Sequence, residues 1–488
     1  MHASETRRDP ADAVRTIRRN RLSAFRKNCL LFERFENRII LSIKIELGCD
    51  NLSNYGQQAY EFLEKLSFRR TSGSAEEQRA AEMILEKVRE LGYEGTVEPF
   101  EVSQMLPAEA ELTLTAPEKV SYTVTGMIDA GETGPEGMDA EFYYPGNLDE
   151  ITLPKCRGKF VLLTARPNEK EYKKLKDAGI VGFAVTNGTM RDTVENADLD
   201  TMRFRTMYFA HGKMPAFAIR VIDAMDLLSR KPEKIHIKLT LAESKRTSRN
   251  IVVEVPGTEK PEEVIVAGAH YDSTEFSYGA WDNGAGVTHL LALLAALKEN
   301  PPKRTVRVIF FGSEEIGLEG SKAYVAAHEE ELGKILYMVN SDVGGSILGG
   351  EMLCSTAHSD MEGYLHGLQC ECGYSARLSS GIMSSDSIVF SDAGIPSLSM
   401  GQMPVDGANF MHTRYDSFAR ISADVLDREI SFLIFLMNRL TSVAVFPVAR
   451  VIPKDLRDKI VGYFGKDFCR TAKQTEFPEE PEPRRPLF

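Results

Sequence analysis

The stretch VRVIFFGSEEIGLEGS, residues 306–321, decides the fold. Its first half is a short apolar run with β-branched residues, which is typical of a strand buried on both faces. Two adjacent carboxylates, Glu314 and Glu315, follow that run. In open parallel sheets, ligands bind beyond the carboxyl ends of the strands. The stretch therefore predicts a buried sheet with a polar site at the end of this strand.

The sequence on both sides alternates in the same way between strands and helices. We predict strands at 264–267, 305–311, 335–339 and 397–400, and helices at 286–298, 323–332, 361–370 and 423–440. This alternation predicts an α/β fold: a mixed, mainly parallel sheet with helices on both faces. Leu290, Leu291, Leu293, Leu294 and Leu297 are expected to pack in its core.

The chain before residue 250 divides into further segments. Residues 60–91 have apolar positions at helical spacing and end at Gly92. Strands at 159–165 and 180–185, with a helix at 171–177 that ends at Gly179, indicate a separate small α/β unit. We predict a basic N-terminal extension (1–50), the first part of the main domain (51–103), an insert (104–245), the catalytic part (246–450) and a C-terminal extension with a disordered tail (451–488).

Composition excludes several classes of protein. With 488 residues, 43% hydrophobic and 27% charged, the chain is neither a small disulfide scaffold nor a disordered protein. Its net charge of −12 argues against a nucleic-acid partner. Seven cysteines imply no disulfide framework, so a reducing, cytoplasmic location is expected.

Neither a membrane span nor a signal peptide is expected. The longest stretch without charge, 283–297, has 15 residues, whereas a spanning helix needs about 20. Eight Lys or Arg residues lie in the first 28, but Glu5, Asp9 and Asp12 interrupt them and no cleavage site follows. A solvated extension, or a start placed too early, is favoured over a helix that binds a membrane surface.

Histidines and carboxylates follow the predicted strands or lie in the neighbouring loops. They are His270, Asp272, Asp282, Glu314, Glu315, Asp342 and His412. Taken singly, each has a structural explanation, such as a helix N-cap, an acidic turn or a core histidine. Together, imidazole and carboxylate form the ligand set that catalytic zinc sites use. Carboxylates packed without a cation would repel one another, and a pair of divalent ions removes that penalty.

Five motifs then carry a resemblance. They are AHYDS (269–273), WDNGAG (281–286), FFGSEEIGLEGS (310–321), NSDVGG (340–345) and HTRYDS (412–417). In order and spacing they resemble the zinc exopeptidases of the aminopeptidase Y, aminopeptidase S and glutamate carboxypeptidase type. The resemblance spans about 250–445, with a weaker match at 70–100. The insert, with GKFVLLTA, KDAGIVGFAV and MPAFAI, is similar to the protease-associated domain found in such enzymes.

The resemblance implies a role for each residue. Two Zn²⁺ ions per chain would be held, one by His270 and Asp342 and the other by Glu315 and His412, with Asp282 bridging them. Adjacent residues in extended chain point in opposite directions, so Glu314 would face the cleft as general base. It would act on a metal-bridged water. Asp272 would orient the ring of His270, although it could instead cap a turn.

Two positions depart from the family pattern. Relatives often have a Tyr before the final His, where this chain has Met411, so the oxyanion would need another group, such as Tyr415, or more help from the metals. Relatives often carry an Arg where this chain has Ser384, which leaves open how the substrate terminus is bound. Asp386, in the same segment, is a further candidate site residue.

Several other histidines, cysteines and glycines are expected to have structural roles and not to form a binding site. His289 is expected in the core, and Gly284 and Gly286 are expected to give backbone freedom beside the site. His358, His366, Cys370 and Cys372 match no ordinary zinc motif and fit a helix plus a turn.

The main hypothesis is a two-zinc aminopeptidase that acts on peptides. A carboxypeptidase or dipeptidase of the same fold, a single-zinc glutaminyl cyclase and an inert receptor-like binding protein are the alternatives. Cobalt or manganese would suit much the same ligands. Side-chain specificity, the role of the insert and the oligomeric state, including a homodimer, are left open.

Overall fold

A computed structural model describes residues 54–403 and 410–465 of the chain. The predicted N-terminal extension (1–50) and the predicted disordered tail, the Pro- and Glu-rich stretch 476–488, lie outside the described residues. The helices are α2 (Tyr55–Leu66), α3 (Ala75–Glu90), α4 (Glu169–Ala178), α5 (Val221–Ser229), α6 (Ala285–Glu299), α7 (Glu319–Ala327), α8 (Asp360–Cys372), α9 (Asp386–Asp392), α10 (Ala423–Ser442) and α11 (Lys454–Phe464).

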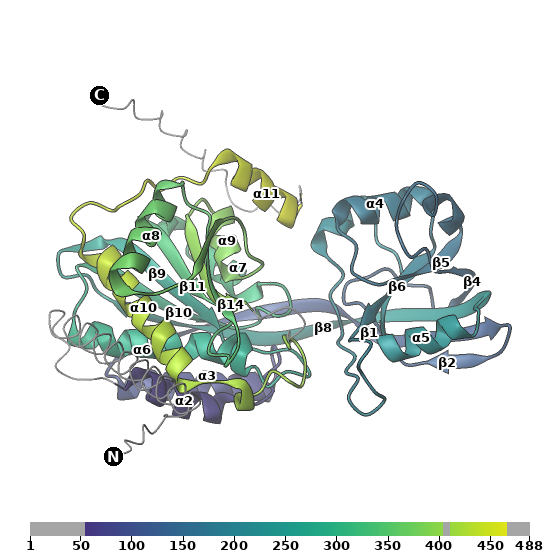
Figure 1. Cartoon of the computed structure of the whole chain (residues 1–488), viewed down its shortest axis with the longest axis horizontal. Coiled ribbons are helices and arrows are strands. Elements are labelled where there is room, and N and C mark those ends of the chain that lie inside the picture. Colours follow the sequence, from purple (N-terminus) through teal and green to yellow (C-terminus); the bar gives the residue numbers. More distant parts are fainter. Residues whose placement is uncertain (1–53, 404–409, 466–488) are drawn as a thin grey trace, which may run out of the picture. The chain divides into compact units, whose positions relative to one another are not determined.

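The strands form one mixed sheet (Figure 1). They are β1 (Thr96–Ala116), β2 (Val120–Tyr122), β3 (Val124–Gly126), β4 (Met138–Tyr143), β5 (Lys159–Leu163), β6 (Gly182–Asn187), β7 (Ala216–Arg220), β8 (Lys234–Val255), β9 (Lys260–His270), β10 (Arg304–Phe311), β11 (Ile335–Ser341), β12 (Gly350–Ser355), β13 (Arg377–Ser380) and β14 (Ser397–Met403). The order is β13-β12-β14-β11-β9-β10-β8-β4-β5-β6-β7-β3, and β1 pairs with β8 and β2. The central strands β14, β11, β9 and β10 are parallel, which confirms the predicted fold class.

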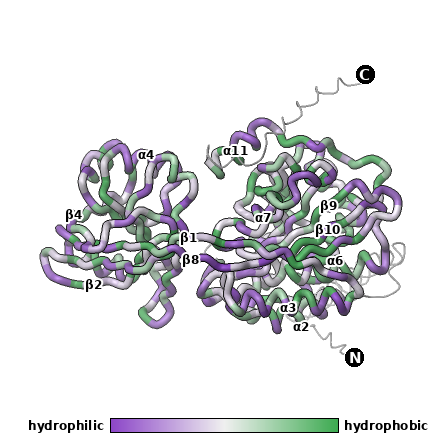
Figure 2. The backbone as a smooth tube through the Cα atoms, turned by 180° about the vertical axis from the view of Figure 1, so that it is seen from behind, coloured by the Kyte–Doolittle hydropathy of each residue, from purple (hydrophilic) through white to green (hydrophobic). Residues whose placement is uncertain are grey.

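Helices cover both faces of the parallel strands. On β9, Ile265 and Ala267 pack into one hydrophobic cluster and Val264 and Val266 into another, because successive side chains point to opposite faces. The first cluster includes residues of α3, α6, α8 and α10, and the second includes residues of α7 and α9. The leucines of α6 lie in the first cluster as predicted. Figure 2 shows the hydrophobic residues concentrated along β9, β10 and α6.

Two predicted helices differ from the structure. Residues 60–91 form two helices, α2 and α3, because Gly73 has a φ of +68° and the Ser74 side chain caps α3 by accepting the N–H of Glu77 at 3.0 Å. The helix predicted at 323–332 ends at Ala327 and a 3₁₀ segment, Glu329–Lys334, follows. His328 leaves the helix and its Nε2 lies 3.0 Å from Glu98 Oε1, so a tertiary contact ends the helix there.

The insert has its own parallel strands and core. Strands β4, β5, β6 and β7 are parallel neighbours, and their side chains belong to a separate hydrophobic cluster. Helix α4 ends at Gly179, whose φ of +78° suits a residue without a Cβ. The predicted boundaries at 104 and 245 fall within the paired strands β1 and β8, which run on through them, so the domain division stays a prediction.

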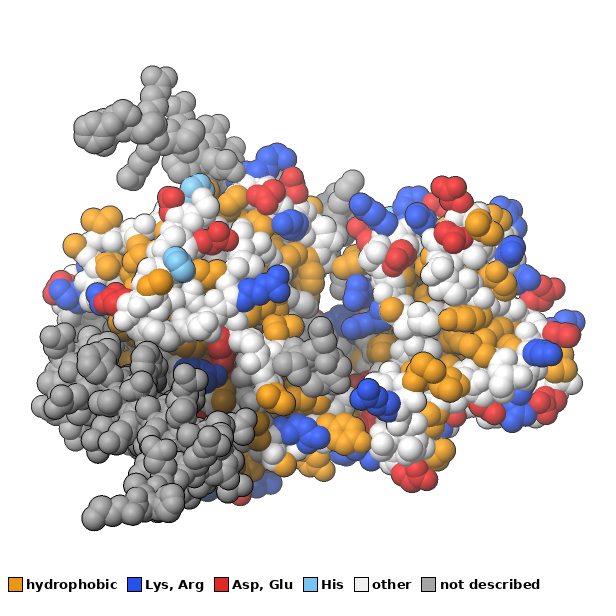
Figure 3. Space-filling view, in the orientation of Figure 1, with side chains coloured by type: hydrophobic (Ala, Val, Ile, Leu, Met, Phe, Trp, Pro, Cys, Tyr) orange, Lys and Arg blue, Asp and Glu red, His pale blue; other side chains and the backbone are white. Residues whose placement is uncertain are grey.

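Three further features of the described residues concern membrane helices, surface charge and cysteines. In the described residues, none of the helices is long and apolar enough to cross a membrane. On the face seen in Figure 3, the described Lys and Arg side chains are interspersed with Asp and Glu. The cysteines at 156, 354, 370 and 372 are free.

Candidate metal centre

The predicted site residues lie at the carboxyl ends of the parallel strands. Strand β9 ends at His270, and Asp342 follows β11 directly. Backbone bonds fix these ends: the N–H of Tyr271 donates to Phe311 O at 2.9 Å, and the N–H of Asp342 donates to Met400 O at 2.9 Å. The sheet therefore brings together side chains that are distant in sequence.

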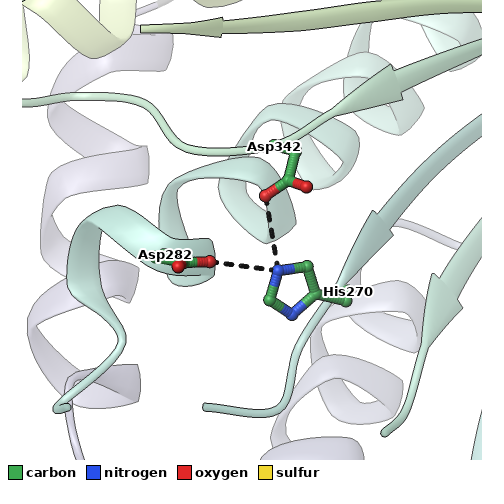
Figure 4. A group of neighbouring side chains, drawn as sticks. All are labelled: His270, Asp282 and Asp342. Carbon is green, nitrogen blue, oxygen red and sulfur yellow. Dashed lines mark ion pairs between the residues drawn. The ribbon is translucent and has the colours of Figure 1, made fainter. Parts of the chain in front are cut away.

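The first group consists of His270, Asp282 and Asp342 (Figure 4). The Nε2 of His270 lies 3.2 Å from an oxygen of Asp282 and 3.3 Å from an oxygen of Asp342. Both carboxylates thus point to the same ring nitrogen from different elements, the turn Ala280–Gly284 and the end of β11. One atom from each residue could bind the same ion, since these atoms lie within 4.8 Å of one another.

The second group consists of Asp282, Glu315 and His412. The Nε2 of His412 lies 3.3 Å from Oδ2 of Asp282 and 3.0 Å from Oε2 of Glu315. Asp282 contributes its Oδ1 to the first group and its Oδ2 to the second. The five residues therefore form two candidate ligand groups that share the carboxylate of Asp282.

The chemistry of these groups fits divalent cations. Burial acts to lower the pKa of His270, but the carboxylates of Glu314 and Asp342 raise it well above its ordinary value. The same balance, with Glu315 and Asp282, raises the pKa of His412. Oε1 of Glu315 is buried without a hydrogen-bond partner in the described structure. A site with this excess of negative charge and an unsatisfied carboxylate oxygen is suited to bind metal ions.

Asp272 holds the turn that carries Glu314. Its carboxylate accepts the N–H of Glu314 at 2.9 Å and that of Glu315 at 3.2 Å. Its Oδ1 also lies 3.4 Å from Nδ1 of His270. Glu314 belongs to neither ligand group, and burial raises its pKa well above the ordinary value. Glu314 accepts two backbone N–H groups at its carbonyl, so Glu314 and Glu315 lie in a turn, and the prediction of an extended chain here is wrong.

Two positioning residues were missed from the sequence. Buried Asp416 accepts the N–H groups of Trp281 at 2.7 Å and Asp282 at 3.2 Å. Buried Arg70 donates to the carbonyl of Gly279 at 2.6 Å and also to that of Tyr271. Both therefore fix the backbone that presents the ligands. Asp416 lies in the motif HTRYDS and Arg70 opens the weaker match, but their partners are main-chain atoms that no residue pattern reveals.

The residues discussed above where the sequence departs from the family pattern line one cavity with the two ligand groups. Asp386 is the exception and does not line it. The cavity has a volume of about 1880 Å³ and is lined by Ser384, Met411 and Tyr415 as well as by the ligand groups. Ser384 Oγ lies 2.6 Å from the hydroxyl of Tyr463 in α11. Asp386 is buried, and burial raises its pKa to about 7.

The residues expected to be structural lie outside both groups. His289 is buried in α6, with Nδ1 2.8 Å from Ser341 Oγ. His366 Nε2 lies 3.9 Å from Cys370 Sγ, and neither joins a ligand group among the described residues. At Gly286 a Cβ would approach Ser341 O to 2.5 Å, which explains the glycine.

Part of the chain matches a known peptidase family. Residues 250–436 match the family model described as Peptidase family M28. This part of the chain is similar to M28 peptidases. Aminopeptidase YwaD of Bacillus subtilis is 26% identical over 397 residues, 76% of this chain and 82% of the relative. Human carboxypeptidase Q is 24% identical over 335 residues, 64% of this chain and 71% of the relative.

Solved structures share the fold of this chain. BSAP, a zinc aminopeptidase from Bacillus subtilis, superimposes with a TM-score of 0.64 at 22% identity, covering 82% of this chain and 99% of that one. The peptidase M28 precursor from Shewanella amazonensis gives 0.65 at 24% identity, covering 85% and 99%. The family assignment makes the protein a metallo-exopeptidase, as predicted. The protease-associated assignment of the insert stays a prediction.

Proposed function

We propose that this M28 peptidase is a two-zinc aminopeptidase that removes residues from the N-terminus of peptides. The observation that carries the proposal is the shared carboxylate of Asp282, which lies 3.2 Å from His270 and 3.3 Å from His412. A single-zinc cyclase needs only one ligand set, and an inert receptor needs none. The names of the similar proteins, aminopeptidase YwaD and the zinc aminopeptidase BSAP, support the same activity.

Each residue has one role in the proposed site. His270 and Asp342 would hold one ion, Glu315 and His412 would hold the other, and Asp282 would contribute an oxygen to each. Zinc, when bound, supplies a Lewis acid that polarises a carbonyl and makes water more acidic. Asp272 fixes the backbone of Glu314 and Glu315, so it orients a base and a ligand together.

Glu314 is the proposed general base. It is beside the ligand Glu315 but outside both ligand groups, so its carboxylate is available for proton transfer. Burial raises its pKa, and a base is most effective when its pKa lies near the working pH. Glu314 takes the proton of the attacking water and delivers it to the leaving amine.

Substitution of the base tests this assignment. Glu314→Gln keeps the side-chain volume and every proposed ligand, so we expect two zinc ions per chain by metal analysis. Turnover of aminoacyl anilides should fall roughly 10²- to 10⁴-fold, the usual effect of losing a general base. Retained turnover would reject the role of Glu314, and fewer than two zinc ions in the unmodified protein would reject the dinuclear site.

A carboxypeptidase is the second candidate, because Arg166 and Arg205 line the same cavity. Neither guanidinium has an ion-pair partner within the described residues, so a substrate carboxylate could bind there. Carboxypeptidase Q is among the similar proteins. Hydrolysis of N-acetylated peptides separates the two activities, since an aminopeptidase requires the free amine and a carboxypeptidase does not.

A further inference from the structure

We propose that Asp200, from the insert, is the anionic anchor that binds the α-amine of the substrate. This inference rests on the proposed aminopeptidase activity. A peptide α-amine has a pKa of about 7.7–8.0 and is largely cationic at neutral pH, so an enzyme that selects it needs a carboxylate at the right place. The proposal also gives the insert a role, namely to complete the active site.

Asp200 is a carboxylate of the catalytic cavity, and one of its oxygens accepts no hydrogen bond from the described residues. Its side chain lines the cavity together with Asp282, Glu315 and His412. Oδ1 is buried and has no hydrogen-bond partner in the described structure. A buried, unsatisfied carboxylate oxygen is costly, and binding a cation offsets that cost. Burial raises the pKa of Asp200 to about 6, against the lowering effect of His412.

An ion pair fixes this segment beside the metal centre. Nε of Arg414 lies 3.0 Å from both oxygens of Asp198, and Arg414 also donates to the carbonyl of Glu195 at 3.1 Å. Arg414 is two residues after the ligand His412, and Asp198 is two residues before Asp200. Leu199, between the two aspartates, is buried. The pair therefore ties the segment that bears Asp200 to the loop that bears His412.

The other carboxylates of the cavity are already engaged or lie at the surface. Asp282, Glu315 and Asp342 are proposed ligands and Glu314 is the proposed base. Asp198 pairs with Arg414, and Asp192 accepts the N–H of Thr189 at 2.8 Å. Glu275 lines the cavity but is exposed. Among the described residues that line the cavity, Asp200 is thus the carboxylate left for the amine.

A binding experiment tests the anchor without turnover. Zinc-loaded Glu314→Gln protein is titrated with L-leucinamide and with 4-methylpentanamide, the same amide without the α-amine, by calorimetry. We expect leucinamide to bind at least tenfold more tightly, and Asp200→Asn in the same background to reduce that ratio to about two, since a hydrogen bond to a charged group is worth about tenfold or more. Glu195→Gln, an exposed carboxylate of the same segment that does not line the cavity, is the matched control and should keep the ratio.

Kinetics supply the second measurement. Asp200→Asn alone should raise KM for leucine anilide roughly 10- to 100-fold, keep two zinc ions and change kcat less. Arg414→Gln should act in the same direction through Asp198, with Arg414→Lys restoring part of the loss. The Asp200→Asn/Arg414→Gln double variant should be no worse than Asp200→Asn.

The outcomes separate the anchor from the proposed function. If Asp200→Asn keeps the preference for leucinamide, or if the unmodified cavity shows no preference, the anchor is rejected even when anilides are cleaved. If anilides are not cleaved at all, the aminopeptidase assignment fails, and the calorimetric ratio still decides whether Asp200 binds an amine.

Discussion

The carboxylate of Glu429 in α10 lies 3.2 Å from Nε2 of His289 in α6, and both side chains support the turn that presents Asp342. Glu429 accepts the N–H of Gly345 at 2.8 Å, while His289 lies 2.8 Å from the hydroxyl of Ser341. This pair sits in the core outside the two ligand groups. It contacts the side chain of Ser341 and the backbone of Gly345, on either side of the proposed zinc ligand Asp342.

Glu429 should make stability depend on pH. Burial raises its pKa to about 8, so the folded chain keeps a proton that the unfolded chain releases near its ordinary pKa of 4.5. Stability is therefore lost as pH rises from about 4.5 to about 8. Glu429→Gln removes this loss. Between pH 5 and pH 8, the free energy of unfolding of the variant should therefore rise relative to that of the unmodified protein, by the order of a few kcal/mol. Urea denaturation of both proteins at the two pH values measures the gain, and a difference independent of pH would contradict it.

Arg70 should matter for stability far more than its neighbour Arg69. Arg70 is fully buried and donates to several backbone carbonyls, including Tyr278 O at 2.8 Å and Gly279 O at 2.6 Å. Lysine cannot make this planar set of bonds, so Arg70→Lys should cost about 3 kcal/mol or more. Arg69 is exposed, and Arg69→Lys should cost at most about 0.5 kcal/mol. Equal denaturation midpoints for the two variants would contradict the assignment.

The fold could be predicted from the sequence wherever the apolar period was strong. The strand predicted at 305–311 corresponds to β10, and the helix predicted at 286–298 corresponds to α6, because both stretches are apolar enough to be buried. The break between α2 and α3 was not predicted, since it depends on the conformation of Gly73 and the cap by Ser74. The 3₁₀ segment after Ala327 depends on the contact of His328 with Glu98, which is distant in sequence.

The sequence predicted the proposed ligands of the candidate site but not the residues that position them. The five proposed ligands are histidines and carboxylates, the residue types that bind zinc, so the sequence indicates them, and the structure brings all five together. Asp416 and Arg70 bind backbone atoms, and Asp200 faces the cavity from the insert. Their roles depend on where distant segments meet, which no local pattern contains.

Asp272 should be required for tight metal binding. Its carboxylate accepts two N–H groups, at Glu314 and Glu315, and lies 3.4 Å from His270. Asp272→Asn keeps the volume but loses the charge and one acceptor. Changes of this kind beside metal ligands typically cost 10- to 100-fold in affinity, so we expect a loss of about that size. Competition with a chromophoric chelator measures it, with Glu275→Gln as the control. Unchanged affinity would show that Asp272 only shapes the turn.

Zinc binding should weaken steeply in acid. In the metal-free site the surrounding carboxylates outweigh burial and raise the pKa values of His270 and His412 well above the ordinary value, so both rings carry protons at neutral pH. An imidazole must lose its proton to bind a metal, and Glu315, whose pKa burial raises to about 7, must also be ionised, so each ion displaces at least one proton and its affinity should fall at least about tenfold for each unit of pH. Chelator competition at pH 6, 7 and 8 measures this slope. His412→Ala should bind one ion fewer and keep the slope for the other, because His270 belongs to a separate ligand group. An affinity that does not change with pH would mean that the two rings are neutral before the metal binds, and the charge balance inferred for this site would be wrong.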